Sequence, residues 1–280
     1  MSLGVAVLGP EGVVLAADSR LTLTAHRPDG TQLPVNFDSA TKLLSFSKPH
    51  NYVGAVTYGA AVIGLRSAHS FMPEFEVNLE DSRRLCVEEY AKKLSEFFLN
   101  QWEETTPKNY TGPSMVFIVG GFDPKEAYGR VFVVDVPNNP EPVERNPGDT
   151  EFGMTWGGDL QIASRLIHGY DPQLLSILQR ELDLGERIDQ IQSILRENLE
   201  FRIPYQVMPL QDCVDLATFM IESTISAQNL SVGVRGVGGP IDVAVITRTR
   251  GLQYIQRKSL YVHSQQSKER GLTDEPCESD

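Results

Sequence analysis

MSLGVAVLGPEGVVLAADSR, residues 1–20, is the stretch that decides the fold. Two apolar runs, residues 3–9 and 11–18, flank the turn at Pro10-Glu11-Gly12, which predicts a β-hairpin. The second run has the composition of a buried strand, yet it ends in Asp18-Ser19-Arg20. A hairpin returns the end of its second strand to the start of its first. We therefore expect the Asp18 carboxylate to lie beside Ser2.

The composition bounds the class of protein. The chain has 280 residues, of which 41% are hydrophobic and 22% charged, so it can bury an ample core. Its net charge of −12 argues against a nucleic-acid partner, which would need a basic face. Three widely spaced cysteines indicate a reducing compartment rather than a disulfide framework. No leader and no apolar run of about 20 residues is present, so we expect a cytoplasmic protein without a membrane partner.

The remaining chain alternates strand blocks with helix blocks. This order predicts an α+β fold with antiparallel sheets and helices outside them, in one domain at 1–263 and a disordered polar tail at 264–280. The segment 21–39 is polar and contains Pro28, Gly30 and Pro34, which indicates a loop. Further strands are expected at 40–47, 52–59, 114–122, 130–136 and 239–248, and helices at 60–71, 81–102, from about 159, 172–200 and 210–228.

The common catalytic motifs are absent from the sequence. There is no GxSxG, no phosphate-binding loop and no HExxH, and the five histidines share no metal-ligand spacing. The glycine-rich run at 233–239 enters a strand rather than a helix, so it predicts a turn. We therefore expect neither a cofactor nor a metal.

Ser2 offers a different chemistry if Met1 is removed. The α-amino group of an N-terminal residue has a pKa of about 7.7–8.0, so part of it is neutral near pH 7 and can take a proton from Oγ. This chemistry needs a nearby cation and an acid that orients the cation, and Lys42 and Asp18 are the candidates. Each residue alone has a plainer interpretation: many chains begin Met-Ser, Asp18 could cap a turn, and Lys42 could face solvent.

Three segments together resemble a known family. GVVLAADSR (12–20), ATKLLSF (40–46) and VGAVTYGAA (53–61) are similar to the first half of proteasome β-type subunits and their bacterial relatives, which are N-terminal nucleophile (Ntn) hydrolases. The resemblance follows the element order over 2–122, 153–169 and 210–247. It implies a four-layer αββα sandwich of two antiparallel sheets, with a helical insertion near 170–205.

The same resemblance implies the site residues. In that family the nucleophile is a terminal Thr, and the acid of A-A-D-[ST]-R follows sixteen positions later, as Asp18 follows Ser2. It implies that Ser2, Asp18 and Lys42 are catalytic and that the backbone N–H of Thr57 stabilises the oxyanion.

The chain also departs from the family. Ser replaces Thr at the terminus, and Trp156-Gly157-Gly158 lacks the hydroxyl of the family's Gly-Ser-Gly turn. The run 234–239 lacks the Asp and Ser that precede the last long strand in the family. Those groups hold the terminal amine, so their absence bears directly on catalysis.

The resemblance implies a peptidase or amidohydrolase that works through an acyl-enzyme on Ser2. Its substrates would be peptides or unfolded polypeptides, and an ATP-dependent unfoldase is a candidate partner. Self-association into rings or stacked arrays is expected, and the aromatic residues Phe97, Phe98 and Trp102 are candidates for an interface. Two alternatives stay open: a catalytically inactive structural subunit resembling the proteasome α-type, and an Ntn acyl transferase or ligase. The first half of the chain retains Ser2, Asp18 and Lys42 and has no helical extension ahead of its first strand. Both features favour the enzyme over the structural subunit.

Overall fold

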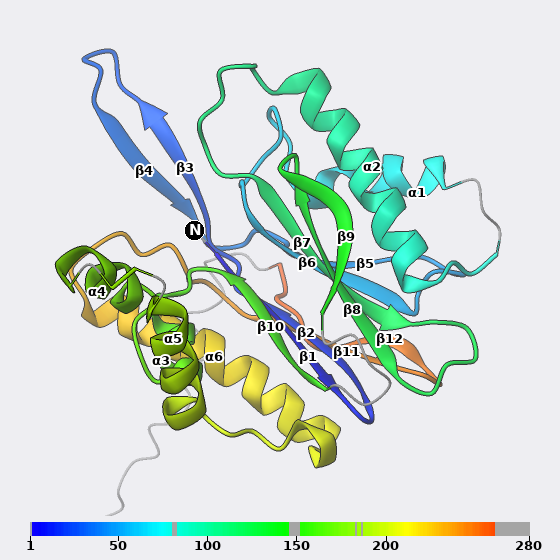
Figure 1. The fold of residues 1–280 in the computed structure, drawn as a ribbon. Helices are drawn as coiled ribbons and strands as arrows, with labels where there is room; N and C mark the ends of the chain where they lie inside the picture. The colour runs from blue at the N-terminus through cyan, green and yellow to red at the C-terminus, as the bar shows by residue number, and fades with distance from the viewer. Residues whose placement is uncertain (1, 80–82, 146–151, 183, 186, 261–280) are drawn as a thin grey trace, which may run out of the picture.

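The computed structural model describes residues 2–79, 83–145, 152–182, 184–185 and 187–260 (Figure 1). Within these ranges the strands form two five-stranded sheets and a two-stranded sheet, and every pair of neighbouring strands is antiparallel. Helices accompany both large sheets. The predicted α+β class with antiparallel sheets is therefore confirmed. The predicted tail at 264–280 and Met1 lie outside the described residues.

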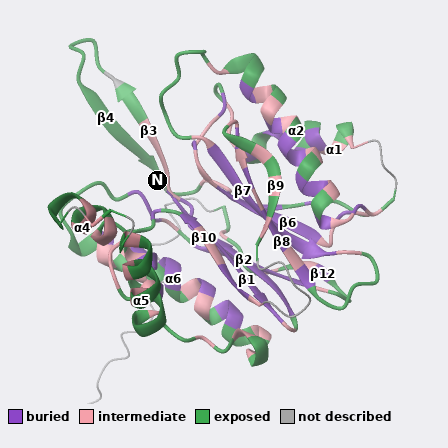
Figure 2. Cartoon of the chain, viewed as in Figure 1, coloured by how far each residue is buried: buried purple, intermediate pink, exposed green. Residues whose placement is uncertain are grey.

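The first sheet holds the opening hairpin at its centre. Its strands, in spatial order, are β10 (Gly153–Gly158), β1 (Leu3–Gly9), β2 (Gly12–Ala17), β11 (Asp242–Thr247) and β12 (Gly251–Gln256). Every residue of β1 and β2 is buried, because both faces of this sheet are covered (Figure 2). The predicted hairpin is present, with Gly4 opposite Ala17.

The second sheet carries the segment with Lys42. Its strands, in spatial order, are β5 (Leu43–Ser45), β6 (Val53–Gly59), β7 (Met115–Phe122), β8 (Gly129–Val136) and β9 (Asn139–Arg145). Lys42 immediately precedes β5, the edge strand, and Gly59 ends β6. The Ser2 and Lys42 segments therefore belong to different sheets.

Three clusters of buried side chains fill the spaces between these elements. One joins the second sheet to α1 (Met72–Asn78) and α2 (Val87–Thr105). Another joins the first sheet to α3 (Gln161–His168) and α6 (Leu210–Leu230). The third contains side chains from both sheets, among them Leu15 of β2 and Ile118 of β7. Helix α2 begins in a capping box, in which the Cys86 Sγ accepts the Glu89 N–H and the Glu89 carboxylate accepts the Cys86 N–H.

Two predicted segments were wrong. The segment 21–39 is not a loop: β3 (Leu21–His26) and β4 (Gln32–Phe37) form a hairpin that stands away from the body (Figure 1). Apolar and polar residues alternate along both strands, and Gly30 turns the chain with a φ of 83°. The helix expected at 60–71 is only a 3₁₀ turn at Ala68–Phe71, because Ile63 and Arg66 form a bridge around Gly64.

Other elements were missed or placed too broadly. Strand β9 (Asn139–Arg145) was not among the expected strands, and β12 follows the last expected strand. The helical segment predicted at 172–200 consists of α4 (Leu174–Leu182) and α5 (Arg187–Leu199), neither of which has a fully buried residue. A second 3₁₀ turn at Tyr205–Val207 leads into α6. The aromatic residues of α2 point inward: Phe98 and Trp102 are buried and Phe97 packs on the same cluster.

Candidate active site

The opening hairpin brings Asp18 to the start of β1, as the sequence predicted. The Leu3 N–H donates to Asp18 Oδ1 at 3.0 Å, and the Asp18 N–H donates to the Leu3 carbonyl at 3.4 Å. Oδ2 accepts the backbone N–H groups of Arg20 and Gly238, both at 3.0 Å. These donors fix the carboxylate on the segment that begins with Ser2.

Lys42 reaches the same carboxylate from the other sheet. Its Nζ lies 2.7 Å from Asp18 Oδ1, and the two side chains are 8% and 0% exposed. The predicted ion pair is therefore present, although 24 positions separate the residues in the sequence. Burial lowers the pKa of Lys42, and the neighbouring Asp18 opposes this shift while the positive charge of Lys258 adds to it. A buried lysine whose pKa is lowered gives up its proton more readily than a surface lysine.

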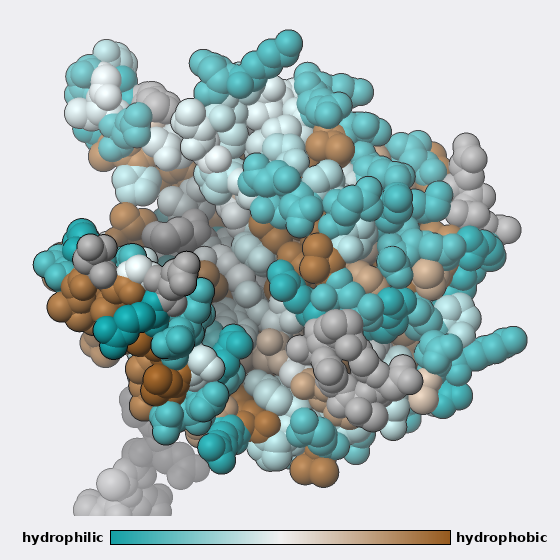
Figure 3. All heavy atoms as spheres, in the orientation of Figure 1, coloured by the Kyte–Doolittle hydropathy of each residue, from teal (hydrophilic) through white to brown (hydrophobic). Residues whose placement is uncertain are grey.

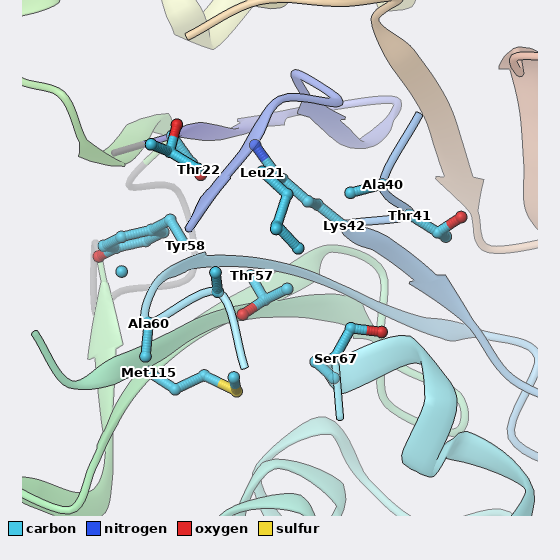
Figure 4. Close-up of a pocket in the computed structure, with 14 residues that line it drawn as sticks. Leu21, Thr22, Ala40, Thr41, Lys42, Thr57, Tyr58, Ala60, Ser67 and Met115 are labelled. Carbon is cyan, nitrogen blue, oxygen red and sulfur yellow. The ribbon is translucent and has the colours of Figure 1, made fainter. Parts of the chain in front are cut away.

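A pocket opens beside this pair. Its lining comprises Ser2, Leu21, Thr22, Ala40, Thr41, Lys42, Thr57, Tyr58, Gly59, Ala60, Ala61, Ser67, Ala68 and Met115 (Figure 4). Ser2 is thus brought together with Lys42 and Thr57 around one cavity. Burial raises the pKa of Tyr58 to about 12, so this phenol is neutral near pH 7.

The expected role of the Thr57 N–H is contradicted by its bonding. This group donates to the Lys42 carbonyl at 3.0 Å, as part of the pairing between the two segments, so it is already occupied. N–H groups alternate between the two sides of a strand. The Gly59 N–H therefore points to the same side of β6 as the Thr57 N–H. Gly59 lies two residues further along the strand and lines the pocket. The Thr57 N–H is therefore not free for an oxyanion, and the Gly59 N–H, two residues further along the strand, is the alternative candidate.

Sequence reasoning missed a second polar group beside Ser2. The Asp159 N–H donates to the Ser2 carbonyl at 2.7 Å, and Gln228 Nε2 of α6 donates to Asp159 Oδ2 at 2.7 Å. Asp159 directly follows Trp156-Gly157-Gly158, the segment without a hydroxyl, which forms the end of β10. The sequence signal that could have identified Asp159 is an acidic residue directly after Gly157 and Gly158.

The solved structures of known proteins define the fold. No family model matches the chain, and no curated protein matches it. Anbu (ancestral beta-subunit) from Yersinia bercovieri is 17% identical with a TM-score of 0.55, covering 91% of this chain and 86% of that one. A Gly-1 mutant of Anbu from Hyphomicrobium sp. strain MC1 has 17% identity and a TM-score of 0.55, covering 91% and 88%. The helical assembly of the Anbu complex from Pseudomonas aeruginosa has 17% identity and a TM-score of 0.56, covering 96% and 91%.

These similarities correct the family that the sequence suggested. The resemblance to proteasome β-type subunits and their bacterial relatives was wrong, because the structural neighbours are Anbu proteins, which are proteasome-like but distinct. At 17% identity the likeness shows the fold alone. The chain therefore has a proteasome-like fold.

The described residues include neither a membrane-spanning helix nor a cluster of metal ligands. In the part of the chain that the structure describes, no helix combines the length and apolar character of a membrane span. Within the same residues, no group of three or more His, Cys, Asp or Glu side chains could hold a metal ion.

Proposed function

We propose that the chain is an amide hydrolase of the N-terminal nucleophile type, in which Ser2 Oγ attacks a peptide carbonyl. One observation carries the proposal: a buried Lys42–Asp18 ion pair is anchored to the Leu3 N–H, beside a pocket that Ser2 lines. A buried ion pair is weak support for stability, so a functional explanation is favoured for its position.

The proposed reaction begins with removal of Met1, which frees the α-amino group of Ser2. The neutral amine takes the Oγ proton as Oγ bonds to the substrate carbonyl carbon. Lys42, held by Asp18, favours the deprotonated oxygen, and the Gly59 N–H donates to the developing oxyanion. The C–N bond then breaks and the leaving amine takes the proton from the α-ammonium group. Water hydrolyses the resulting ester and restores Ser2.

We further propose that the protein works as an oligomer. The Anbu complex from Pseudomonas aeruginosa is described as a helical assembly, and this chain exposes apolar side chains on α4, on α5 and on the β3–β4 hairpin. Extended peptides are the proposed substrates, because the pocket is a concave site between the start of β1 and the end of β6 rather than a flat surface. We also propose that residues 1–263 form one domain in which the packed sheets and helices make a four-layer αββα sandwich.

The proposed function is tested with Ser2→Ala on a panel of short fluorogenic peptides. Intact mass first establishes that Met1 has been removed, since a retained or acetylated terminus would eliminate the base. We expect Ser2→Ala to lose at least about 1,000-fold in kcat/KM with its assembly unchanged. Ser226→Ala, at an exposed position of α6, is the control and should retain full activity. Equal activity of Ser2→Ala and wild type would refute Ser2 as the nucleophile, and no activity in either would favour a structural subunit.

A further inference from the structure

Two buried carboxylates flank the Ser2 segment, and only one of them has a cation. Asp18 is paired with Lys42. Asp159 is 8% exposed, and among the described residues no lysine, arginine or histidine forms an ion pair with it. A carboxylate taken out of water normally requires a paired charge. Asp159 therefore lacks the partner that its burial calls for.

In the described part of the chain, the groups that donate hydrogen bonds to the Asp159 side chain are neutral. Oδ2 accepts from Gln228 Nε2 at 2.7 Å, and Oδ1 accepts the Gln161 N–H at a longer 3.3 Å. Gln228 is itself fixed, because its Oε1 accepts the Val237 N–H at 3.0 Å. Because the Gln228 amide is neutral and is itself fixed, it orients the Asp159 carboxylate without neutralising its charge.

The backbone places Asp159 beside Ser2. The Asp159 N–H donates to the Ser2 carbonyl at 2.7 Å, continuing the pairing of Leu3 with Gly158. Gly158 permits this approach, because a Cβ there would lie 1.9 Å from the Ser2 carbonyl oxygen. Removal of Met1 would create a new cation on the residue to which Asp159 is bonded.

We propose that Asp159 is a positioning residue that holds the α-amino group of Ser2. This proposal rests on the proposed function. When the amine takes the Oγ proton, the ammonium group gains the Asp159 carboxylate as its ion-pair partner, and the carboxylate gains the cation that it lacks. Among the described residues that line the pocket with Ser2, the other ionisable side chains are Lys42, which is paired with Asp18, and Tyr58, which is neutral near pH 7.

The test measures the pKa of the α-amino group and does not depend on peptidase activity. Protein with Met1 removed, checked by intact mass, is labelled with ¹³C-serine, and the Ser2 resonance is identified by its absence in Ser2→Ala. The chemical shift of Ser2 is then followed against pH in wild type and in Asp159→Asn. Asparagine keeps the size of the side chain and one acceptor oxygen, so it removes the charge and one of the two hydrogen bonds that Asp159 accepts. We expect the amine pKa to fall by about one unit or more in Asp159→Asn, and the acid limb of kcat/KM to move with it.

Asp171→Asn is the matched control, since it removes the same charge at the other end of α3, where Asp171 is paired with Arg165. It should leave the amine pKa unchanged. If Asp159→Asn does not fold, Asp159→Ser gives the same comparison with a smaller neutral side chain. An unchanged pKa in a folded Asp159 variant overturns the proposal. This result is distinct from failure of the proposed function, which would appear as a retained Met1 or an active Ser2→Ala.

Discussion

Asp18 shows how a single side chain can connect distant parts of the chain. Its two oxygens accept from Leu3, Arg20, Gly238 and Lys42, which lie on four separate segments. An isolated buried carboxylate would be unfavourable, but charge-assisted hydrogen bonds and one cation satisfy it. The acid at the end of a core strand is therefore explained by what it fixes: the first residues of β1 and the ammonium group of Lys42.

Gly158 provides a stability prediction at the residue scale. Its φ is 106°, and a Cβ at this position would lie 1.9 Å from the Ser2 carbonyl oxygen, a backbone atom that cannot move aside without shifting β1. We expect Gly158→Ala to lower the free energy of unfolding by about 3 kcal/mol or more, measured by urea denaturation. The same variant should displace Ser2 and reduce activity.

The control for this variant is Gly30→Ala in the β3–β4 turn. Gly30 has a similar φ of 83° but nothing within 4 Å of a Cβ, so only the backbone conformation is penalised. A loss of about 1 kcal/mol is expected there. Equal losses in the two variants would mean that the contact with Ser2 contributes nothing.

At the element scale, the sequence predicted best the elements with a single strong pattern. The β1–β2 hairpin has two apolar runs around a turn, and α2 has acids in its first turn and one apolar face, so both were found. The β3–β4 hairpin was missed because Pro28, Gly30 and Pro34 outweighed the alternation of apolar residues. β9 was missed for the same reason.

Site residues could be predicted where their spacing in the sequence indicates that they meet. They could not be predicted where contacts between distant segments determine their positions. The interval from Ser2 to Asp18 indicated which residues meet across the hairpin. The occupied N–H of Thr57 could not be foreseen, since it depends on how β6 pairs with the residue before β5. Asp159 and Gln228 are 69 positions apart, and no local pattern links an acid that follows a strand to an amide in a helix.

Helix α6 supplies a pH prediction at the element scale. Cys213, on the face of α6 that packs against β1, is 1% exposed, and burial raises the pKa of its thiol to about 11 from an ordinary value of 9.0. Because the folded-state pKa lies above the unfolded one, the thiol's contribution is fully present below pH 9 and is lost as the pH rises towards 11. We expect the free energy of unfolding of wild type, relative to Cys213→Ala, to fall by about 2 kcal/mol across this range.

The measurement is a series of urea denaturation curves of both proteins between pH 8 and 11. Taking the difference cancels the titration of tyrosines and lysines that the two proteins share. The prediction fails if the difference in the free energy of unfolding between wild type and Cys213→Ala stays constant with pH. That result would show that the thiol has the same pKa in the folded and unfolded chain.

At the scale of the whole molecule, the large apolar side chains that are exposed among the described residues lie outside α2. The aromatic side chains of that helix pack into the core, so they do not supply the interface that the sequence suggested. Apolar side chains are exposed instead on α4 and α5, at Ile177, Leu182, Ile194 and Leu199 (Figure 3). The β3–β4 hairpin exposes Leu33, Val35 and Phe37 on one face.

The hairpin face is the surface that we expect a second copy of the chain to cover. Phe37 is 54% exposed, and together with Leu21, Leu23, Val62 and Leu65 it lines a shallow groove beside the candidate site.

Light scattering at micromolar concentration should give a mass well above the 31.1 kDa monomer for wild type. Phe37→Ser should shift it towards the monomer, because removal of a large apolar side chain from an interface weakens association by about 10-fold or more. Leu230→Ser, at a still more exposed position (91%) at the end of α6 and far from the hairpin in sequence, is the control and should assemble as wild type does. A monomeric wild type would contradict self-association itself, whereas an assembled Phe37→Ser would move the interface to α4 and α5.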